Sequence, residues 1–447
     1  MGRLFGTDGV RGIANKDLTN ELALSIGKAA AKVLAGELGR KPTVLIGKDT
    51  RASGDMLEAA LTAGLCAVGA NVLSVGVVPT PAVAYLIGRY GCDAGVMISA
   101  SHNPCEYNGI KIFQSTGYKL DDAIEEEIEA IILDGAEEIP EKLGGDVGNR
   151  LYCKTAVEDY VRHVVETTDV RFDGLNIALD CANGSASVCA KQIFTALGAR
   201  CYMLSDTPDG VNDHCGSTHP GELMQFVTDN GLDLGLAFDG DADRMLAVDE
   251  NGQLVDGDKV IAICAKRMLD EGTLAKNTAV VTVMSNMGFF KFCEENGIAC
   301  EKTAVGDRYV LERMLQKGYN IGGEQSGHVI FLDYATTGDG ELSGVQLLKT
   351  VVKSGKKLSQ LAKIMTVYPQ VLINVQVTPE GKQKYNNDEY IISAVQQAEM
   401  DLMGDGRVLV RVSGTEPLVR VMLEGKDLEK ITRLGNRIAD VVRERLS

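Results

Sequence analysis

The sequence predicts an α/β protein of several domains that ends in a smaller α+β region. Its 447 residues, of which 45% are hydrophobic, are enough for roughly three domains that each bury a core. A pattern of strand, polar turn, amphipathic helix, glycine and second strand recurs three times before residue 303. The last part of the chain lacks this pattern and predicts antiparallel strands with two helices.

Each recurring unit is typical of a parallel βαβ arrangement, in which a glycine ends the helix before the next strand. The expected elements are strand 43–46, helix 55–68, Gly69 and strand 71–75; strand 177–179, a helix that ends near 197, Gly198 and strand 201–204; and strand 280–283, a helix that ends near 296, Gly297 and strand 298–302. Polar turns follow the first strand of each unit. Ligands of open α/β sheets bind at such turns, beyond the carboxyl ends of the strands.

The C-terminal region is expected to fold separately. It predicts strands at 371–377, 408–412 and 419–423 and helices at 388–400 and 428–445. Polar or glycine-rich breaks fall at 141–149, 249–258 and 365–370. We therefore expect domains at 1–150, 151–250, 251–367 and 368–447.

Composition excludes several classes of function. The net charge of −17 disfavours nucleic acid and anionic membranes as partners, because these polyanions repel the chain overall. Eleven cysteines without a C-x-x-C pair predict neither a zinc site nor a regular disulfide framework, which indicates a reducing compartment. Glycines and prolines interrupt the uncharged stretch 59–86, and the N-terminus lacks the apolar core of a signal peptide. We therefore expect a cytoplasmic protein.

One segment predicts a reactive serine. Residues 95–104 bring Ser101 from the end of an apolar strand into a loop, because Pro104 stops the strand from continuing. Most loop serines only bind nearby backbone groups, so a structural turn is the alternative. The interpretation of Ser101 therefore depends on what lies beside it.

A second strand, 234–238, opens onto a run of three alternating carboxylates, Asp239, Asp241 and Asp243. Alternate residues of an extended segment point the same way, so these carboxylates can converge on one cation. The run resembles an EF-hand loop, but Arg244 stands where that loop needs glycine, and helices do not flank it. A phosphorylated serine beside a divalent ion would make a phosphoryl-transfer site.

Two further loops carry groups that suit a sugar phosphate. Residues 323–328 place a carboxylate, a hydroxyl and an imidazole at alternate positions, which suits the hydroxyls of a sugar ring. The second loop offers two guanidinium groups, two hydroxyls and backbone N–H donors to a phosphate. Its residues are Arg411, Ser413, Gly414, Thr415 and Arg420. A structural turn is the alternative for each loop.

In chain order, four of these loops resemble the signature loops of the α-D-phosphohexomutase family. They are residues 99–104, 239–244, 323–328 and 411–415, and the resemblance covers essentially the whole chain. Segments 5–12, 215–218 and 305–310 are most similar to bacterial members that act on glucosamine phosphates. The resemblance implies three similar α/β domains with mixed sheets and a C-terminal α+β domain around a central cleft.

The resemblance also implies roles for individual residues. Ser101 would be a phosphoserine, and one Mg²⁺ per chain would lie between its phosphate and Asp239, Asp241 and Asp243. The residues implied in catalysis beside Ser101 are Arg11, His102, Lys111 and His328, with Lys111 and His328 as candidates for the proton transfers. The residues implied to bind substrate are Arg244, Arg308, Glu324, Ser326, Arg411, Ser413, Gly414, Thr415 and Arg420.

The implied reaction converts glucosamine 6-phosphate to glucosamine 1-phosphate through glucosamine 1,6-bisphosphate, for amino-sugar nucleotide and cell-wall precursor synthesis. The same chemistry on glucose or mannose phosphates is the nearest alternative, because these sugars differ at one carbon. An aspartyl-phosphate hydrolase with Asp239 as nucleophile and a non-catalytic sugar-phosphate-binding protein are alternatives from other classes. P-loop and G-x-S-x-G motifs are absent from the sequence. The sequence does not fix the oligomeric state, so a homodimer stays open.

Overall fold

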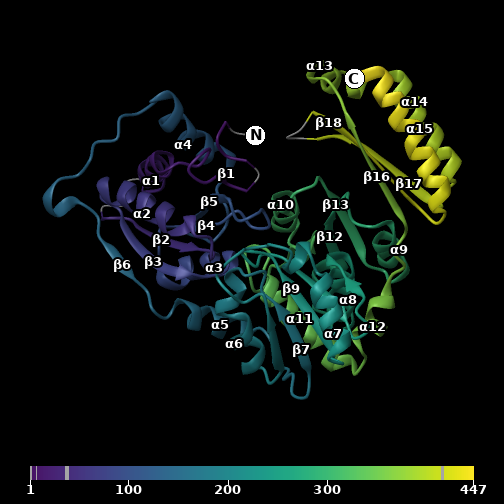
Figure 1. Cartoon of the computed structure of the whole chain (residues 1–447), viewed down its shortest axis with the longest axis horizontal. Coiled ribbons are helices and arrows are strands. Elements are labelled where there is room, and N and C mark those ends of the chain that lie inside the picture. Colours follow the sequence, from purple (N-terminus) through teal and green to yellow (C-terminus); the bar gives the residue numbers. More distant parts are fainter. Residues whose placement is uncertain (1–2, 7, 36–39, 414–416) are drawn as a thin grey trace. The chain divides into compact units, whose positions relative to one another are not determined.

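The computed structural model describes residues 3–6, 8–35, 40–413 and 417–447. Over these residues the strands form four sheets (Figure 1). The chain divides into two compact units, residues 1–284 with 298–364 and residues 285–297 with 365–447. The domain boundaries predicted near residues 150, 250 and 367 stay predictions.

The first sheet is mixed, with the order β1-β5-β4-β2-β3-β6. Parallel pairs join β4, β2, β3 and β6, whereas β5 runs antiparallel to both of its neighbours. The strands are β1 (Val10–Ile13), β2 (Thr43–Lys48), β3 (Asn71–Val77), β4 (Ala94–Ile98), β5 (Tyr107–Gln114) and β6 (Arg150–Tyr152). The helices are α1 (Asn20–Ala35), α2 (Ser53–Ala67), α3 (Thr80–Tyr90) and α4 (Asp122–Asp134).

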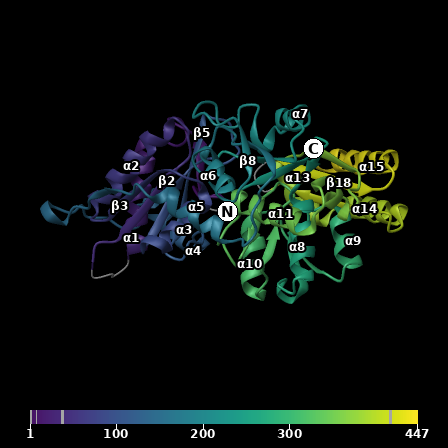
Figure 2. The same cartoon turned by 90° about the horizontal axis from the view of Figure 1, so that it is seen from below.

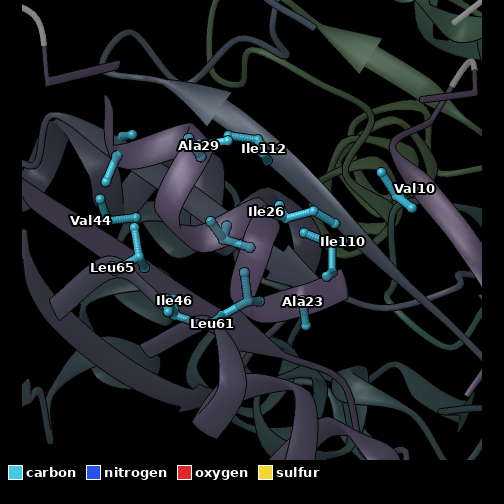
Figure 3. Close-up of a cluster of buried hydrophobic side chains, with 14 of the residues drawn as sticks. Val10, Ala23, Ile26, Ala29, Val44, Ile46, Leu61, Leu65, Ile110 and Ile112 are labelled. Atoms are coloured by element: carbon cyan, nitrogen blue, oxygen red, sulfur yellow. The ribbon is translucent and has the colours of Figure 1, made fainter. Parts of the chain in front are cut away.

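The core of this sheet lies under α1 and α2. Figure 3 shows Ile26 of α1 among Leu61 and Leu65 of α2 and the strand residues Val44 and Ile110, all of them buried. Glycine allows the two helices to approach closely, because a Cβ at position 64 would lie 2.2 Å from the carbonyl oxygen of residue 24. The closely packed core fixes the sheet whose strand ends carry Ser101.

The second and third sheets are also mixed, with the orders β11-β10-β9-β7-β8 and β13-β12-β14-β15. The elements of the second are α5 (Ala156–Glu166), β7 (Asn176–Asp180), α6 (Ala190–Ala196), β8 (Arg200–Leu204), α7 (Gly221–Asp229), β9 (Leu234–Phe238), β10 (Met245–Asp249) and β11 (Leu254–Val255). The elements that follow are α8 (Gly257–Asp270), β12 (Thr278–Thr282), α9 (Met287–Glu295), β13 (Ala299–Thr303), α10 (Asp307–Lys317), β14 (Ile321–Gly323), β15 (Val329–Phe331), α11 (Gly340–Ser354) and α12 (Leu358–Leu361).

The three sheets share one topology. Their common parts have the orders β3-β2-β4-β5, β8-β7-β9-β10 and β13-β12-β14-β15. In each, the first three strands are parallel and the fourth runs antiparallel to the third. This confirms the prediction of three similar α/β domains with mixed sheets.

The C-terminal sheet differs because both of its strand pairs are antiparallel, in the order β16-β18-β17. Figures 1 and 2 show α14 and α15 against this sheet, and their apolar faces form its core. The elements are β16 (Gln370–Gln376), α13 (Pro379–Lys384), α14 (Glu389–Leu402), β17 (Gly406–Val412), β18 (Leu418–Gly425) and α15 (Leu428–Leu446). The α+β prediction is confirmed. Within the described ranges, no helix has the length and apolar character needed to cross a membrane.

Candidate active site

Ser101 lies just beyond the end of β4, with 1% of its surface exposed. Its backbone has a φ of 51°, in the left-handed region that residues other than glycine seldom adopt. The Ser101 hydroxyl donates a 2.6 Å hydrogen bond to Oδ2 of Asp239. The serine predicted to react therefore meets the predicted carboxylate cluster directly.

The three carboxylates follow β9 and are buried together. One oxygen from each of Asp239, Asp241 and Asp243 lies within 4.8 Å of the others. Burial and the two neighbouring carboxylates raise the pKa of Asp239 well above its ordinary value. Oδ1 of Asp241 and Oδ1 of Asp243 have no hydrogen-bond partner among the described residues. Buried anionic oxygens without partners fit a divalent cation, which prefers carboxylate ligands.

Lys111 of β5 partly balances this negative charge. Its ammonium lies 2.7 Å from Oδ2 of Asp241, 3.0 Å from Asp8 and 3.7 Å from Asp243. Burial disfavours the charged lysine, but the three aspartates outweigh burial and raise its pKa. Lys111 is therefore held as a cation in contact with the carboxylate cluster that the Ser101 hydroxyl also meets.

Asp8 connects Lys111 to further charges. It forms an ion pair with Arg11 and accepts a 2.6 Å hydrogen bond from Lys119, which also donates to Asp307 at 2.7 Å. Burial opposes ionisation of Asp8, but Lys111, Lys119 and Arg11 hold its pKa well below the usual range. Arg11 also donates to the Asn103 side chain at 3.2 Å, so it touches the loop of Ser101 as expected.

The two histidines occupy different environments. Nδ1 of His102 lies 3.4 Å from the Ser101 hydroxyl, and burial, with Arg244 and Arg11, lowers its pKa to about 4. His328 is 2% exposed, and its Nδ1 lies 3.7 Å from Oδ1 of Asp243. The backbone N–H of Gly338 donates to Nε2 of His328 at 3.1 Å. Burial disfavours the charged imidazole, but Asp243 and Asp307 outweigh burial and raise the pKa of His328. In this conformation His328 therefore contacts the carboxylate cluster through Asp243.

The predicted sugar-binding residues are brought together only in part. Nε of Arg244 lies 3.8 Å from Asp243 and has no hydrogen-bond partner among the described residues, which leaves it able to bind a phosphate. Glu324 accepts a hydrogen bond from the backbone N–H of Gly306 at 3.1 Å, and Ser326 is exposed. Arg308 forms an ion pair with Asp122 and lines a small cavity together with Lys111, and its substrate role stays a prediction.

The predicted phosphate loop lies in the C-terminal unit. Arg411 and Arg420 are directly opposite each other on β17 and β18. Burial and the charge of Arg420 lower the pKa of Arg411. Ser413 is 2% exposed, while Gly414 and Thr415 lie outside the described residues. Like charges on opposed strand positions are unfavourable, so this pair is suited to a bound anion.

Several residues around Ser101 were not predicted from the sequence. Arg51 and Asn212 donate to the Ser101 carbonyl at 2.9 and 2.8 Å, and Thr80 donates to Oδ2 of Asp241 at 2.6 Å. Asp8 and Lys119 were missed as well. A signal existed for Arg51, because it follows β2 at the carboxyl end of a parallel strand. Asn212 and Thr80 come from elements distant in sequence, which no local pattern connects to Ser101.

Models of the four domains of the phosphoglucomutase/phosphomannomutase family match this chain. Alpha/beta/alpha domains I, II and III match residues 2–138, 158–252 and 256–368, and the C-terminal domain matches residues 372–441. The chain belongs to this family, whose members are phosphohexose mutases.

Individual relatives with higher sequence identity match the chain over its full length. Phosphoglucosamine mutase from Ruminiclostridium cellulolyticum is 56% identical over 449 residues, which cover 100% of both chains. Phosphoglucosamine mutase from Acetivibrio thermocellus is 54% identical over 448 residues, again 100% of both chains. Among solved structures, a phosphoglucomutase/phosphomannomutase family protein from Burkholderia thailandensis has a TM-score of 0.81 and 25% identity, covering 99% of this chain and 98% of that one.

Proposed function

We propose that this chain is a mutase that interconverts glucosamine 6-phosphate and glucosamine 1-phosphate through a phosphorylated Ser101. The observation that carries the proposal is the 2.6 Å contact of the Ser101 hydroxyl with Asp239, inside a cluster of three buried carboxylates. The names of relatives 54–56% identical over the full chain favour glucosamine phosphates over glucose or mannose phosphates.

The reaction consists of two opposite phosphoryl transfers. In the first, the bond between phosphorus and Oγ of phosphoserine 101 breaks, and a bond from phosphorus to a sugar hydroxyl forms. That hydroxyl loses its proton, and Oγ of Ser101 leaves protonated. The resulting glucosamine 1,6-bisphosphate presents its other phosphate, which returns to Ser101 by the reverse step. The enzyme thus ends phosphorylated, and the sugar phosphate has changed position.

Asp239, Asp241, Asp243 and the phosphate on Ser101 would hold one Mg²⁺. Their fit rests on one oxygen each of Asp241 and Asp243 that accepts no hydrogen bond from the described residues, and on the hard, anionic character of the ligand set. When bound, the ion supplies positive charge that stabilises the transferred phosphoryl group. Arg244 adds a second positive charge, because its Nε lies 3.8 Å from Asp243 and lacks another partner among the described residues.

The remaining residues divide between proton transfer and binding. Lys111 and His328 stay the proposed groups for the proton transfers, and Nδ1 of His102, 3.4 Å from the Ser101 hydroxyl, could exchange a proton with it. The catalytic roles that the family resemblance implies for Arg11 and His328 also stay proposals. For binding, Glu324 and Ser326 would contact sugar hydroxyls, Arg308 would release Asp122 to bind substrate, and the phosphate that does not react would bind the set Arg411, Ser413, Gly414, Thr415 and Arg420. The central cleft, the homodimer and the cytoplasmic location also stay predictions.

Turnover of three substrates under equal conditions tests the proposal. A single charged hydrogen bond to the 2-amino group is worth about 1.5–3 kcal/mol, so we expect kcat/KM for glucosamine 6-phosphate to exceed that for glucose 1-phosphate and mannose 1-phosphate by roughly ten- to hundredfold. Glu324→Ala should lower turnover on all three sugars alike, because Glu324 would contact hydroxyls that they share. A higher kcat/KM for glucose or mannose phosphates would instead assign the chain to the alternative activity.

A further inference from the structure

The Arg51 guanidinium donates five hydrogen bonds in the region around Ser101. It lies in the turn between β2 and α2, and none of its side chain is exposed. Its Nε donates to Asp49 at 2.9 Å, and its two Nη atoms donate to four backbone carbonyls at 2.5–2.9 Å. These carbonyls belong to Ser101, Asn103, Pro104 and Tyr107. The five contacts match the five N–H groups of a guanidinium, which lysine could not replace with three.

Asn212 holds the same loop from the second sheet. It lies in the segment between β8 and β9, is 6% exposed, and donates through Nδ2 to the carbonyls of Ser101 at 2.8 Å and Asn103 at 3.1 Å. Arg51 donates to these same two carbonyls. Two groups far apart in sequence therefore converge on one short stretch of backbone.

The held backbone is strained and needs support. Ser101 has a φ of 51°, and its N–H donates to the hydroxyl of Ser99 at 3.0 Å, which itself donates to Asp49 at 2.5 Å. This conformation directs Oγ of Ser101 to Asp239. The loop must keep this conformation both with and without a phosphate on Ser101, because Oγ gives up and takes back that phosphate in each cycle.

We propose that Arg51 and Asn212 are positioning residues that hold the serine loop, residues 99–107, in one geometry for both phosphoryl transfers. The proposal rests on the proposed function, since the same Oγ must meet two different sugar oxygens in one catalytic cycle. Neither residue has a contact that requires substrate. Their loss should therefore lower kcat and leave KM nearly unchanged, because a displacement of about 1 Å in a reacting group costs roughly hundredfold in rate.

The test uses the full chain with Arg51→Lys and Asn212→Ala. Two quantities are measured: hydrogen–deuterium exchange of the peptide 99–107, and kcat and KM for glucosamine 6-phosphate. We expect faster exchange in this peptide in both variants, kcat reduced by roughly ten- to hundredfold, and KM within about twofold of the parent. Exchange does not depend on which sugar is used, so failure of the positioning proposal is distinguishable from failure of the proposed function.

Arg267→Lys and Asn320→Ala are matched controls. Arg267 is a nearly buried arginine that pairs with Glu271 at 2.9 Å, and Asn320 is a 7% exposed amide that donates to the Thr273 carbonyl at 2.9 Å. Neither touches the serine loop, so neither should change its exchange or kcat. Exchange of peptide 99–107 equal to that of the parent, or a kcat equal to that of the parent, in Asn212→Ala overturns the proposal. The Asn212→Ala result tests the proposal even if Arg51→Lys does not fold.

Discussion

Two regions of the molecule place like charges side by side, and they differ in sign. Residues Asp239, Asp241 and Asp243 gather three buried carboxylates, whereas Arg411 and Arg420 oppose two guanidinium groups across a strand pair. Elsewhere on the C-terminal sheet opposite charges meet, as in the 2.6 Å pair of Arg407 with Glu424. Opposite charges compensate each other, while the repulsion within a cluster of one sign is relieved by nearby counter-charges, by protonation or by a ligand of the other sign. The comparison supports the proposal of a cation at the first region, and the phosphate at the second region stays a proposal.

The largest effect is expected at the carboxylate cluster. Asp241→Asn should lower kcat by roughly hundredfold or more, because losing one anionic ligand weakens the charge stabilisation of the transferred phosphoryl group by about 3 kcal/mol. Steady-state kinetics at several Mg²⁺ concentrations measure the change. The matched control is Asp249→Asn, since Asp249 is also buried but accepts hydrogen bonds from the backbone of residues 251 and 253. Full activity of chelator-treated protein would show that the carboxylate cluster is structural and would contradict the cation proposed there.

Loss of an arginine from the pair Arg411 and Arg420 should change KM more than kcat. Arg420→Ala should raise KM for glucosamine 6-phosphate by roughly ten- to hundredfold with little change in kcat, because a charged hydrogen bond to the non-reacting phosphate is worth about 1.5–3 kcal/mol. Arg407→Ala, on the same sheet, should instead lower the unfolding temperature, since it leaves Glu424 buried without its pair. Equal KM values in Arg420→Ala and the parent would contradict phosphate binding at this strand pair.

A third acidic cluster sharpens the comparison, because hydrogen-bond donors and raised pKa values relieve its repulsion. Asp339 and Glu341 are buried; the hydroxyl of Tyr160 donates to Asp339 at 2.9 Å, and the thiol of Cys189 donates to Glu341 at 3.1 Å. Burial raises the pKa of Asp339 to about 7, and burial together with Asp339 raises that of Glu341 to about 8. Hydrogen-bond donors and protonation relieve the repulsion at this site, so it needs no ion.

The pH dependence of stability follows from these two raised pKa values. Unfolded carboxyl groups ionise near pH 4, so between about pH 4 and 8 the folded chain binds more protons than the unfolded chain. The free energy of unfolding contributed by this pair is therefore complete below pH 4 and is lost as the pH rises through 7 and 8, at most about 1.4 kcal/mol per pH unit for each group. Urea unfolding from pH 6 to 9 should show a shallower loss in Glu341→Gln. An equal slope in the variant and the parent would contradict this interpretation.

The sequence predicted the fold and the strand-end positions of Ser101 and the three aspartates for identifiable reasons. The recurring strands, the helices and the glycines that end them are local patterns, and β2, α2 and β3 lie where they were expected. Ser101 and the three aspartates follow strands, where side chains of an α/β protein meet ligands. Local patterning was therefore sufficient for these parts.

The unpredicted parts depend on contacts between distant segments. The roles of Arg51 and Asn212 follow from the carbonyls they reach, 50 and 111 positions away in the chain. The contact of Lys119 with Asp8 and Asp307 likewise joins three segments that are distant in the chain. Such contacts are set by packing of whole sheets, which a single sequence does not reveal through spacing. The ion pair of Arg308 with Asp122 has the same origin.

Transfer of a labelled phosphate in a single turnover tests the central claim most directly. Enzyme is charged with ³²P from labelled glucosamine 1,6-bisphosphate, its labelled peptide is identified by mass spectrometry, and excess glucosamine 6-phosphate is then added. We predict that the label resides on Ser101, leaves it within one turnover and is recovered on the sugar. Label on Asp239, or undiminished turnover in Ser101→Ala, would contradict the account.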